Sequence, residues 1–189
     1  MADYPSEDLG LPSGTLWAKY NVGANSPEEY GAFYAWGETS PKREYSWDSY
    51  RVGSAPSFSK YGKDGKTELE LSDDAASANM GGMWHMPTKT QIEELFAHTT
   101  SAWTTFNDVT GVSFTSNVNG NSIFIPAAGC RSNTRMYDSR ITFRVWSSSL
   151  YSLTHNYAWY FWGKHNGSRD DGGGNGQRFC GYSIRGVIG

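Results

Sequence analysis

The C-terminal third of the chain, residues 135–182, constrains the fold most, because it sets tryptophans among irregular polar and aromatic residues. Trp146, Trp159 and Trp162 recur through it, and the residues between them are rich in Tyr, Ser, Gly, Asn and Arg. Antibody paratopes favour Tyr, Ser, Gly and Asn, with Arg at hot spots: aromatic rings give rigid contact area and small polar side chains give adaptable hydrogen bonds. The pattern indicates a contact surface on an anchored frame rather than a catalytic centre.

A codon argument sharpens this interpretation. Most irregular positions carry residues that can be reached from an asparagine codon by changing its adenines, whereas the three tryptophans, Lys164 and Gln177 cannot. Adenine-directed mutagenesis of a template repeat would leave this pattern, and an ordinary glycine-rich loop with scattered aromatics is the alternative. The predicted ligand-binding positions are Arg144, Tyr151, His155, Asn156, Tyr157, Tyr160, Gly163, His165, Ser168, Arg169, Asp171, Gly173, Asn175 and Phe179.

Length and charge favour one domain without a nucleic-acid interface. A chain of 189 residues can bury roughly 70% of its unfolded surface around a single core. The net charge of −3 argues against the basic stripe of a nucleic-acid-binding domain. No apolar run approaches the roughly 20 residues that span a bilayer, so no membrane insertion is expected. Residues 1–5 lack the features of a signal peptide, which leaves a trimmed chain or export by another route, such as inside a virion.

The cysteines and histidines predict neither an active site nor a metal centre. Cys130 and Cys180 are too few for a disulfide scaffold and lack metal-ligand spacing. The sequence is compatible with two free thiols or with one disulfide between them. Asp170 and Asp171 lie in a glycine-rich loop where carboxylates are usually just solvated. We therefore expect no enzyme activity, no bound metal and no cofactor.

Three segments carry helix signals. Ser26-Pro27-Glu28-Glu29 has a capping serine, a proline at the first helical position and a carboxylate placed for a capping box. Residues 73–79 have acidic residues first and two glycines after them. The strongest signal is Lys89–His98, which Thr88 and Gln91 can cap reciprocally and whose Ile92, Leu95 and Phe96 form one apolar stripe.

Strand and turn signals dominate from Val112 onward. Residues 112–115 alternate, Asn119-Gly120 is a hairpin signal, and residues 122–126 form an apolar strand ended by a proline. Residues 182–187 are strand-like, and we expect the two chain ends to meet in one sheet. Residues 39–68 read as an irregular surface excursion.

Several stretches together resemble one known family: residues 8–18, 30–38, 84–89, 125–129, 146–149 and 181–185. They are similar to short Bacteroidetes-type domains distantly related to formylglycine-generating enzymes. The resemblance spans nearly the whole chain and implies a single α+β domain over residues 1–189. That domain would have a C-type-lectin-like fold of the formylglycine-generating-enzyme-like subtype, with two main helices on a small twisted antiparallel sheet and long irregular loops.

The frame around the irregular segment also resembles the variable protein of a diversity-generating retroelement. That resemblance implies a non-catalytic ligand- or receptor-binding protein, hypervariable over residues 135–182, on a phage virion or a cell surface. Its partner would be a protein or glycan on a host or neighbouring cell. Neither the ligand nor the oligomeric state follows from the sequence. The alternative is an invariant structural or adhesin domain of a bacterial surface protein.

Overall fold

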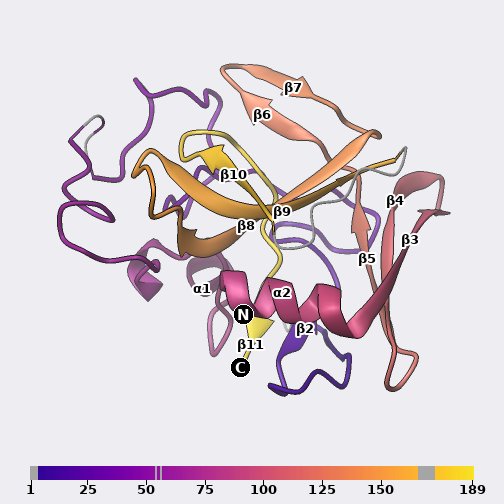
Figure 1. Cartoon of the computed structure of the whole chain (residues 1–189). Coiled ribbons are helices and arrows are strands. Elements are labelled where there is room, and N and C mark those ends of the chain that lie inside the picture. Colours follow the sequence, from indigo (N-terminus) through magenta and orange to yellow (C-terminus); the bar gives the residue numbers. More distant parts are fainter. Residues whose placement is uncertain (1–3, 54, 56, 166–172) are drawn as a thin grey trace.

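The computed structural model describes residues 4–53, 55, 57–165 and 173–189, and it is mostly β-structure (Figure 1). Strands and bridges make up 36% of the described residues, and helices make up 11%. The described strands form four small antiparallel sheets. The expected α+β, C-type-lectin-like architecture of two main helices on one sheet is therefore wrong.

The chain ends share the first sheet, as expected. Its strand order is β1-β2-β11, so both ends pair with the middle strand rather than with each other. Figure 1 shows both termini at the same side of the molecule. The strands are β1 (Ser6–Asp8), β2 (Leu16–Ala18) and β11 (Val187–Ile188).

A central sheet carries most of the predicted contact segment. Its strand order is β10-β9-β8, and Trp146 faces Tyr160 across the β8–β9 pair. The register becomes irregular between Trp146 and Leu150. The strands are β8 (Thr142–Leu150), β9 (Tyr157–Lys164) and β10 (Gly174–Gln177).

The other two sheets are local in sequence. The loop at residues 117–121, which contains Asn119-Gly120, joins two strands of a three-stranded meander, and Gly120 adopts a left-handed φ of 77°. The meander consists of β3 (Thr99–Phe106), β4 (Val109–Ser116) and β5 (Ser122–Pro126). A hairpin of β6 (Cys130–Ser132) and β7 (Arg135–Tyr137) projects beside the central sheet in Figure 1.

Two of the three predicted helices form. The capping box of Thr88 and Gln91 begins α2 (Lys89–His98), whose Ile92, Leu95 and Phe96 are buried. Asp74 caps α1 (Ala75–Met80) by accepting a hydrogen bond from the Ser77 N–H, directly after the 3-10 helix η1 (Leu71–Asp73). Neither α1 nor α2 has the length and apolar character needed to cross a membrane.

The helix predicted at Ser26 is a turn. The Glu29 N–H reaches the Ser26 carbonyl at 3.3 Å, but the chain then folds back, and the Ala32 N–H donates to the Val22 carbonyl at 2.9 Å. Gly31 makes this return possible with a φ of 70°, because a Cβ there would lie 2.5 Å from the Val22 carbonyl oxygen. A close backbone approach overrides the local capping signal.

The central sheet separates two apolar clusters. Trp146 and Ala158 belong to one of them, together with Trp36 and Trp84. Phe143, Val145 and Phe161 belong to the other, which includes Trp17 and the buried stripe of α2. Trp17, Trp36, Trp84 and Trp146 are buried in these clusters, while Trp103 is only partly buried.

Candidate ligand-binding surface

The alternation of β9 divides the predicted positions between the two faces of the central sheet. Successive strand residues point to opposite faces, so Tyr157 shares the α2 side with Phe161. Tyr160 and its neighbour across the strands, Trp146, face the other side, as does Arg144 two residues earlier on β8. The predicted positions therefore do not share one face, and the structure gathers them into three groups.

The first group is the turn between β8 and β9. His155 is exposed, whereas Tyr151, Asn156 and Tyr157 are half-buried. The Tyr151 N–H donates to the Tyr157 carbonyl at 3.1 Å, and the Tyr157 N–H donates to the Thr154 carbonyl at 3.1 Å. These hydrogen bonds between backbone groups hold the turn, while Tyr151 also packs on Trp159 at a ring-centroid distance of 4.9 Å and the His155 side chain is exposed.

An aromatic cavity adjoins this turn. It has a volume of about 340 Å³ and is lined by Trp47, Asp48, Ala55, Phe58 and Asn156. Trp47 makes edge-to-face ring contacts with Tyr50, Phe58 and Phe179, at centroid distances of 5.5, 5.5 and 5.0 Å. Two predicted ligand-binding residues, Asn156 and Phe179, thus meet residues of the 39–68 excursion, which sequence reasoning left without a role.

Arg178 packs against Phe58, which lines the cavity, and the sequence did not suggest this role. Its side chain is fully buried and lies over the rings of Trp36 and Phe58, with Cζ 4.8 and 5.0 Å from their centroids. Its guanidinium donates to the Tyr50 hydroxyl at 2.8 Å and to the His155 carbonyl at 3.0 Å. Weaker hydrogen bonds reach the carbonyls of Tyr61 and Lys60. One cation therefore joins the turn after β8 to the 39–68 excursion.

The second group surrounds Arg144 on the opposite side of the sheet. Arg144 donates to Cys130 Sγ at 2.6 Å and pairs with Asp138 at 2.7 Å. Its guanidinium also lies over Tyr182, with Cζ 5.9 Å from the ring centroid. Because its partners are the chain's own side chains, Arg144 is a half-buried structural residue as well as a predicted contact.

Tyr160 completes this second group by packing on Trp146 and Tyr182, with ring centroids 5.9 and 4.8 Å apart. Strand β10 crosses these rings closely. A Cβ on Gly174 would meet the Tyr160 ring at 3.0 Å, and one on Gly176 would meet the Tyr182 hydroxyl at 2.7 Å. Asn175, between these glycines, is exposed.

The third group lies at the far end of β9, roughly 23 Å from the first at about 3.3 Å per residue. His165 is exposed and packs on Trp103 at 5.3 Å. A Cβ would lie 2.6 Å from the Phe143 ring at Gly163 and 2.3 Å from the Tyr160 carbonyl oxygen at Gly173. Those two glycines have no room for a variable side chain. Three further predicted positions, Ser168, Arg169 and Asp171, lie outside the described residues.

The two cysteines are free thiols. Burial raises the pKa of the Cys130 thiol, although Arg144 opposes the shift. Burial also raises the pKa of the Cys180 thiol to about 11. A high thiol pKa means little nucleophilic thiolate at neutral pH. Within the described part of the chain, no three His, Cys, Asp or Glu side chains gather as a metal site would require.

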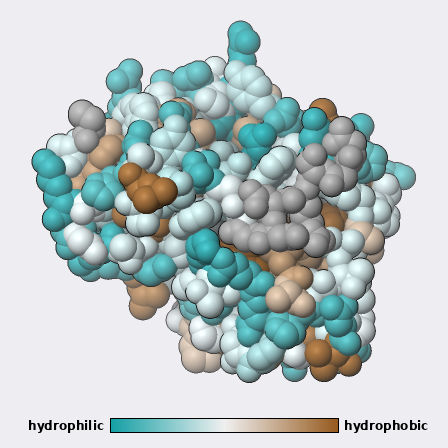
Figure 2. Space-filling view, viewed as in Figure 1, coloured by the Kyte–Doolittle hydropathy of each residue, from teal (hydrophilic) through white to brown (hydrophobic). Residues whose placement is uncertain are grey.

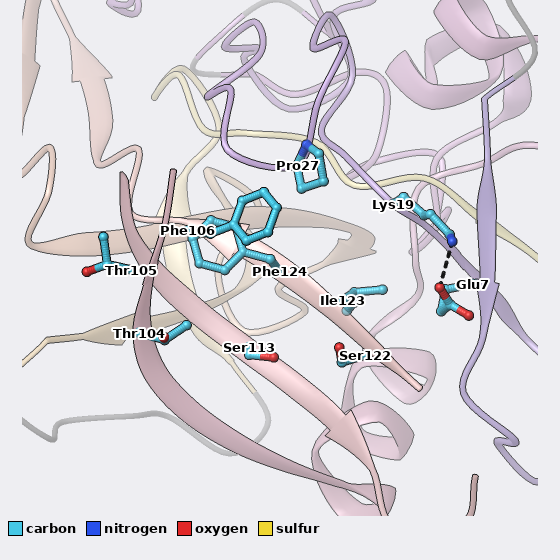
Figure 3. Close-up of a pocket in the computed structure, with 10 residues that line it drawn as sticks. All are labelled: Glu7, Lys19, Pro27, Thr104, Thr105, Phe106, Ser113, Ser122, Ile123 and Phe124. Atoms are coloured by element: carbon cyan, nitrogen blue, oxygen red, sulfur yellow. Dashed lines mark ion pairs between the residues drawn. The ribbon is translucent and has the colours of Figure 1, made fainter. Parts of the chain in front are cut away.

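A second cavity lies away from the predicted contact segment, on the outer face of the β3–β4–β5 sheet (Figure 3). Its volume is about 270 Å³, and Phe106 and Phe124 line it with ring centroids 5.6 Å apart. The Lys19–Glu7 ion pair bounds the side opposite these rings. None of the predicted ligand-binding residues that the structure describes lines this cavity.

On the face drawn in Figure 2, the described hydrophobic residues lie in small separate areas of a mostly hydrophilic surface. The signal that could have revealed the aromatic cavity was the run of Tyr45, Trp47, Tyr50, Phe58 and Tyr61 in an otherwise polar stretch.

Comparisons with family models, with curated proteins and with solved structures found no match to this chain.

Proposed function

We propose that this chain is a non-catalytic ligand- or receptor-binding protein whose contact surface centres on the turn at residues 151–157. The observation that carries the proposal is the contrast at this turn between exposed side-chain surface and a hydrogen-bonded backbone. His155 is exposed, yet its own carbonyl is tied to the fully buried Arg178. Such an arrangement allows side chains to vary without disturbing the fold.

Two further features support binding rather than chemistry. The cavity beside Trp47 adds a concave element to the turn, and ligand sites are typically concave, mostly apolar and supplied with a few polar groups. Burial raises the pKa of both thiols, which disfavours a reactive cysteine pair.

We further propose that a retroelement diversifies this surface and that the protein is displayed on a phage or cell surface. The codon pattern of residues 135–182 supports this part. The space around Gly163 and Gly173 restricts the variable set to the remaining predicted positions. The partner is then a protein or glycan on a host or neighbouring cell.

Binding is tested by replacing Tyr151, His155 and Tyr157 together with serine and screening both proteins on arrays of host surface proteins and glycans. The expected result is an unchanged fold and a lost or altered ligand. The same ligands bound by both proteins would refute the proposal for this turn. Val118→Ser, at an exposed position in the β4–β5 loop and outside residues 135–182, is the control.

Diversification is tested at the genomic locus. A nearby reverse transcriptase gene and a template repeat that differs from the coding segment only at adenines are expected. Sequences of independent isolates that are identical over residues 135–182 would instead favour an invariant structural or adhesin domain.

A further inference from the structure

The cavity beside the turn combines aromatic side chains with a carboxylate, and this combination favours some ligand charges over others. Among the described residues that line it, Asp48 alone is charged, and its exposed carboxylate has no ion-pair or hydrogen-bond partner in the described part of the chain. The neighbouring Arg51 guanidinium binds the Asp48 carbonyl oxygen at 3.1 Å and does not line the cavity. The aromatic pocket is therefore lined by an exposed carboxylate that no described residue neutralises.

The aromatic walls suit a positive charge. Trp47 stays half-exposed after contacting three other rings, so part of its indole is open to the cavity. Tryptophan is the side chain whose ring face attracts cations most strongly. Phe58 is held at a positive φ of 42°, a conformation that is uncommon for a bulky residue and costs conformational energy.

We propose that this cavity takes an alkylammonium group of the ligand, with Trp47 as its aromatic wall and Asp48 as its counter-ion. This inference rests on the proposed function, because it names the chemistry that the same surface would select. The cavity volume of about 340 Å³ is at the low end of ligand pockets, about 300 to 1,000 Å³. It fits one side chain or headgroup better than a whole ligand.

Because the buried Arg178 guanidinium is itself a cation near the cavity, binding of a second cation depends on the Asp48 carboxylate. That guanidinium already lies over Phe58, so it repels a second cation and occupies part of the aromatic surface. The attraction has to come from Trp47 and the Asp48 carboxylate, and removing the carboxylate should remove the preference for a cation. A lysine side chain and a choline headgroup share this chemistry.

The test uses choline and its uncharged carbon isostere, 3,3-dimethylbutan-1-ol, as probes of the full chain in an NMR titration. The Trp47→Phe variant assigns the indole N–H resonance of Trp47. We expect choline to shift this resonance and the alcohol to bind at least about tenfold more weakly. Asp48→Asn should weaken choline binding by about tenfold and leave the alcohol unchanged. Asp108→Asn in the remote β3–β4 turn is the charge-matched control.

Two further probes separate the sources of the cation: N-acetyl-lysine methylamide represents a protein side chain, and phosphocholine represents a lipid headgroup. The inference is overturned if choline causes no shift at about 10 mM, if the alcohol binds equally well, or if Asp48→Asn has no effect. In that case the array experiment on the turn variant still decides the proposed function. Normal choline binding together with an unaltered array profile would refute the proposed function alone.

Discussion

Truncation of Trp146 is the sharpest test of the division between anchors and contact residues. The indole is fully buried, stacks on Tyr182 at a centroid distance of 4.2 Å and donates its N–H to the Tyr34 carbonyl at 2.9 Å. Replacing a buried Trp or Phe with Ala costs about 3 to 5 kcal/mol. For a chain of this size, each kcal/mol lowers the melting temperature by about 2 to 4 °C. Trp146→Ala should therefore lower it by roughly 6 to 20 °C.

Two further variants, Trp159→Ala and His155→Ala, compare the loss of a buried anchor with the loss of less buried side chains. Trp159 is half-exposed on the other face of β9, where it contacts Tyr151 and lies under the Lys89 ammonium. Because less of its surface is buried, Trp159→Ala should cost clearly less than Trp146→Ala. His155→Ala, at an exposed position, should stay within about 0.5 kcal/mol. Thermal and urea unfolding followed by circular dichroism measure all three, and a Trp146→Ala change below about 1 kcal/mol would refute the reasoning.

Three further predictions concern local features. Since burial raises the pKa of Cys180 to about 11, only about 0.1% of it is thiolate at pH 8. Its alkylation by iodoacetamide, followed by mass spectrometry, should be far slower than in urea and should accelerate as pH rises toward 11. Gly176→Ala forces a Cβ against the Tyr182 hydroxyl at 2.7 Å and should destabilise by about 1 to 3 kcal/mol in urea unfolding, whereas the adjacent Asn175→Ala should not. Thr88→Ala removes one half of the α2 capping box and should lower the unfolding free energy by about 1 kcal/mol; an unchanged value would show that packing of Leu95 and Phe96 alone fixes this helix start.

The amino-acid sequence by itself determined the local elements whose signals involve neighbouring residues. Thr88 and Gln91 lie three residues apart, so their reciprocal cap and the helix after it could be predicted. The same holds for the Asn119-Gly120 turn, the strand at residues 122–126 and the burial of Trp17, Trp36, Trp84 and Trp146. In each case the physical cause acts within a few residues or depends only on side-chain apolarity.

Only the tertiary structure decided the features that depend on distant residues. The helix predicted at Ser26 is lost because Gly31 packs against the Val22 carbonyl. The predicted contact positions divide among three groups because β9 alternates and spans the sheet. The cavity of Trp47, Asp48 and Asn156 joins segments about a hundred residues apart, and buried Arg178 holds them together through carbonyl oxygens. Arg178 also donates to the Tyr50 hydroxyl, but carbonyls occur at every residue, so a side-chain pattern in the sequence could not reveal the three carbonyl partners.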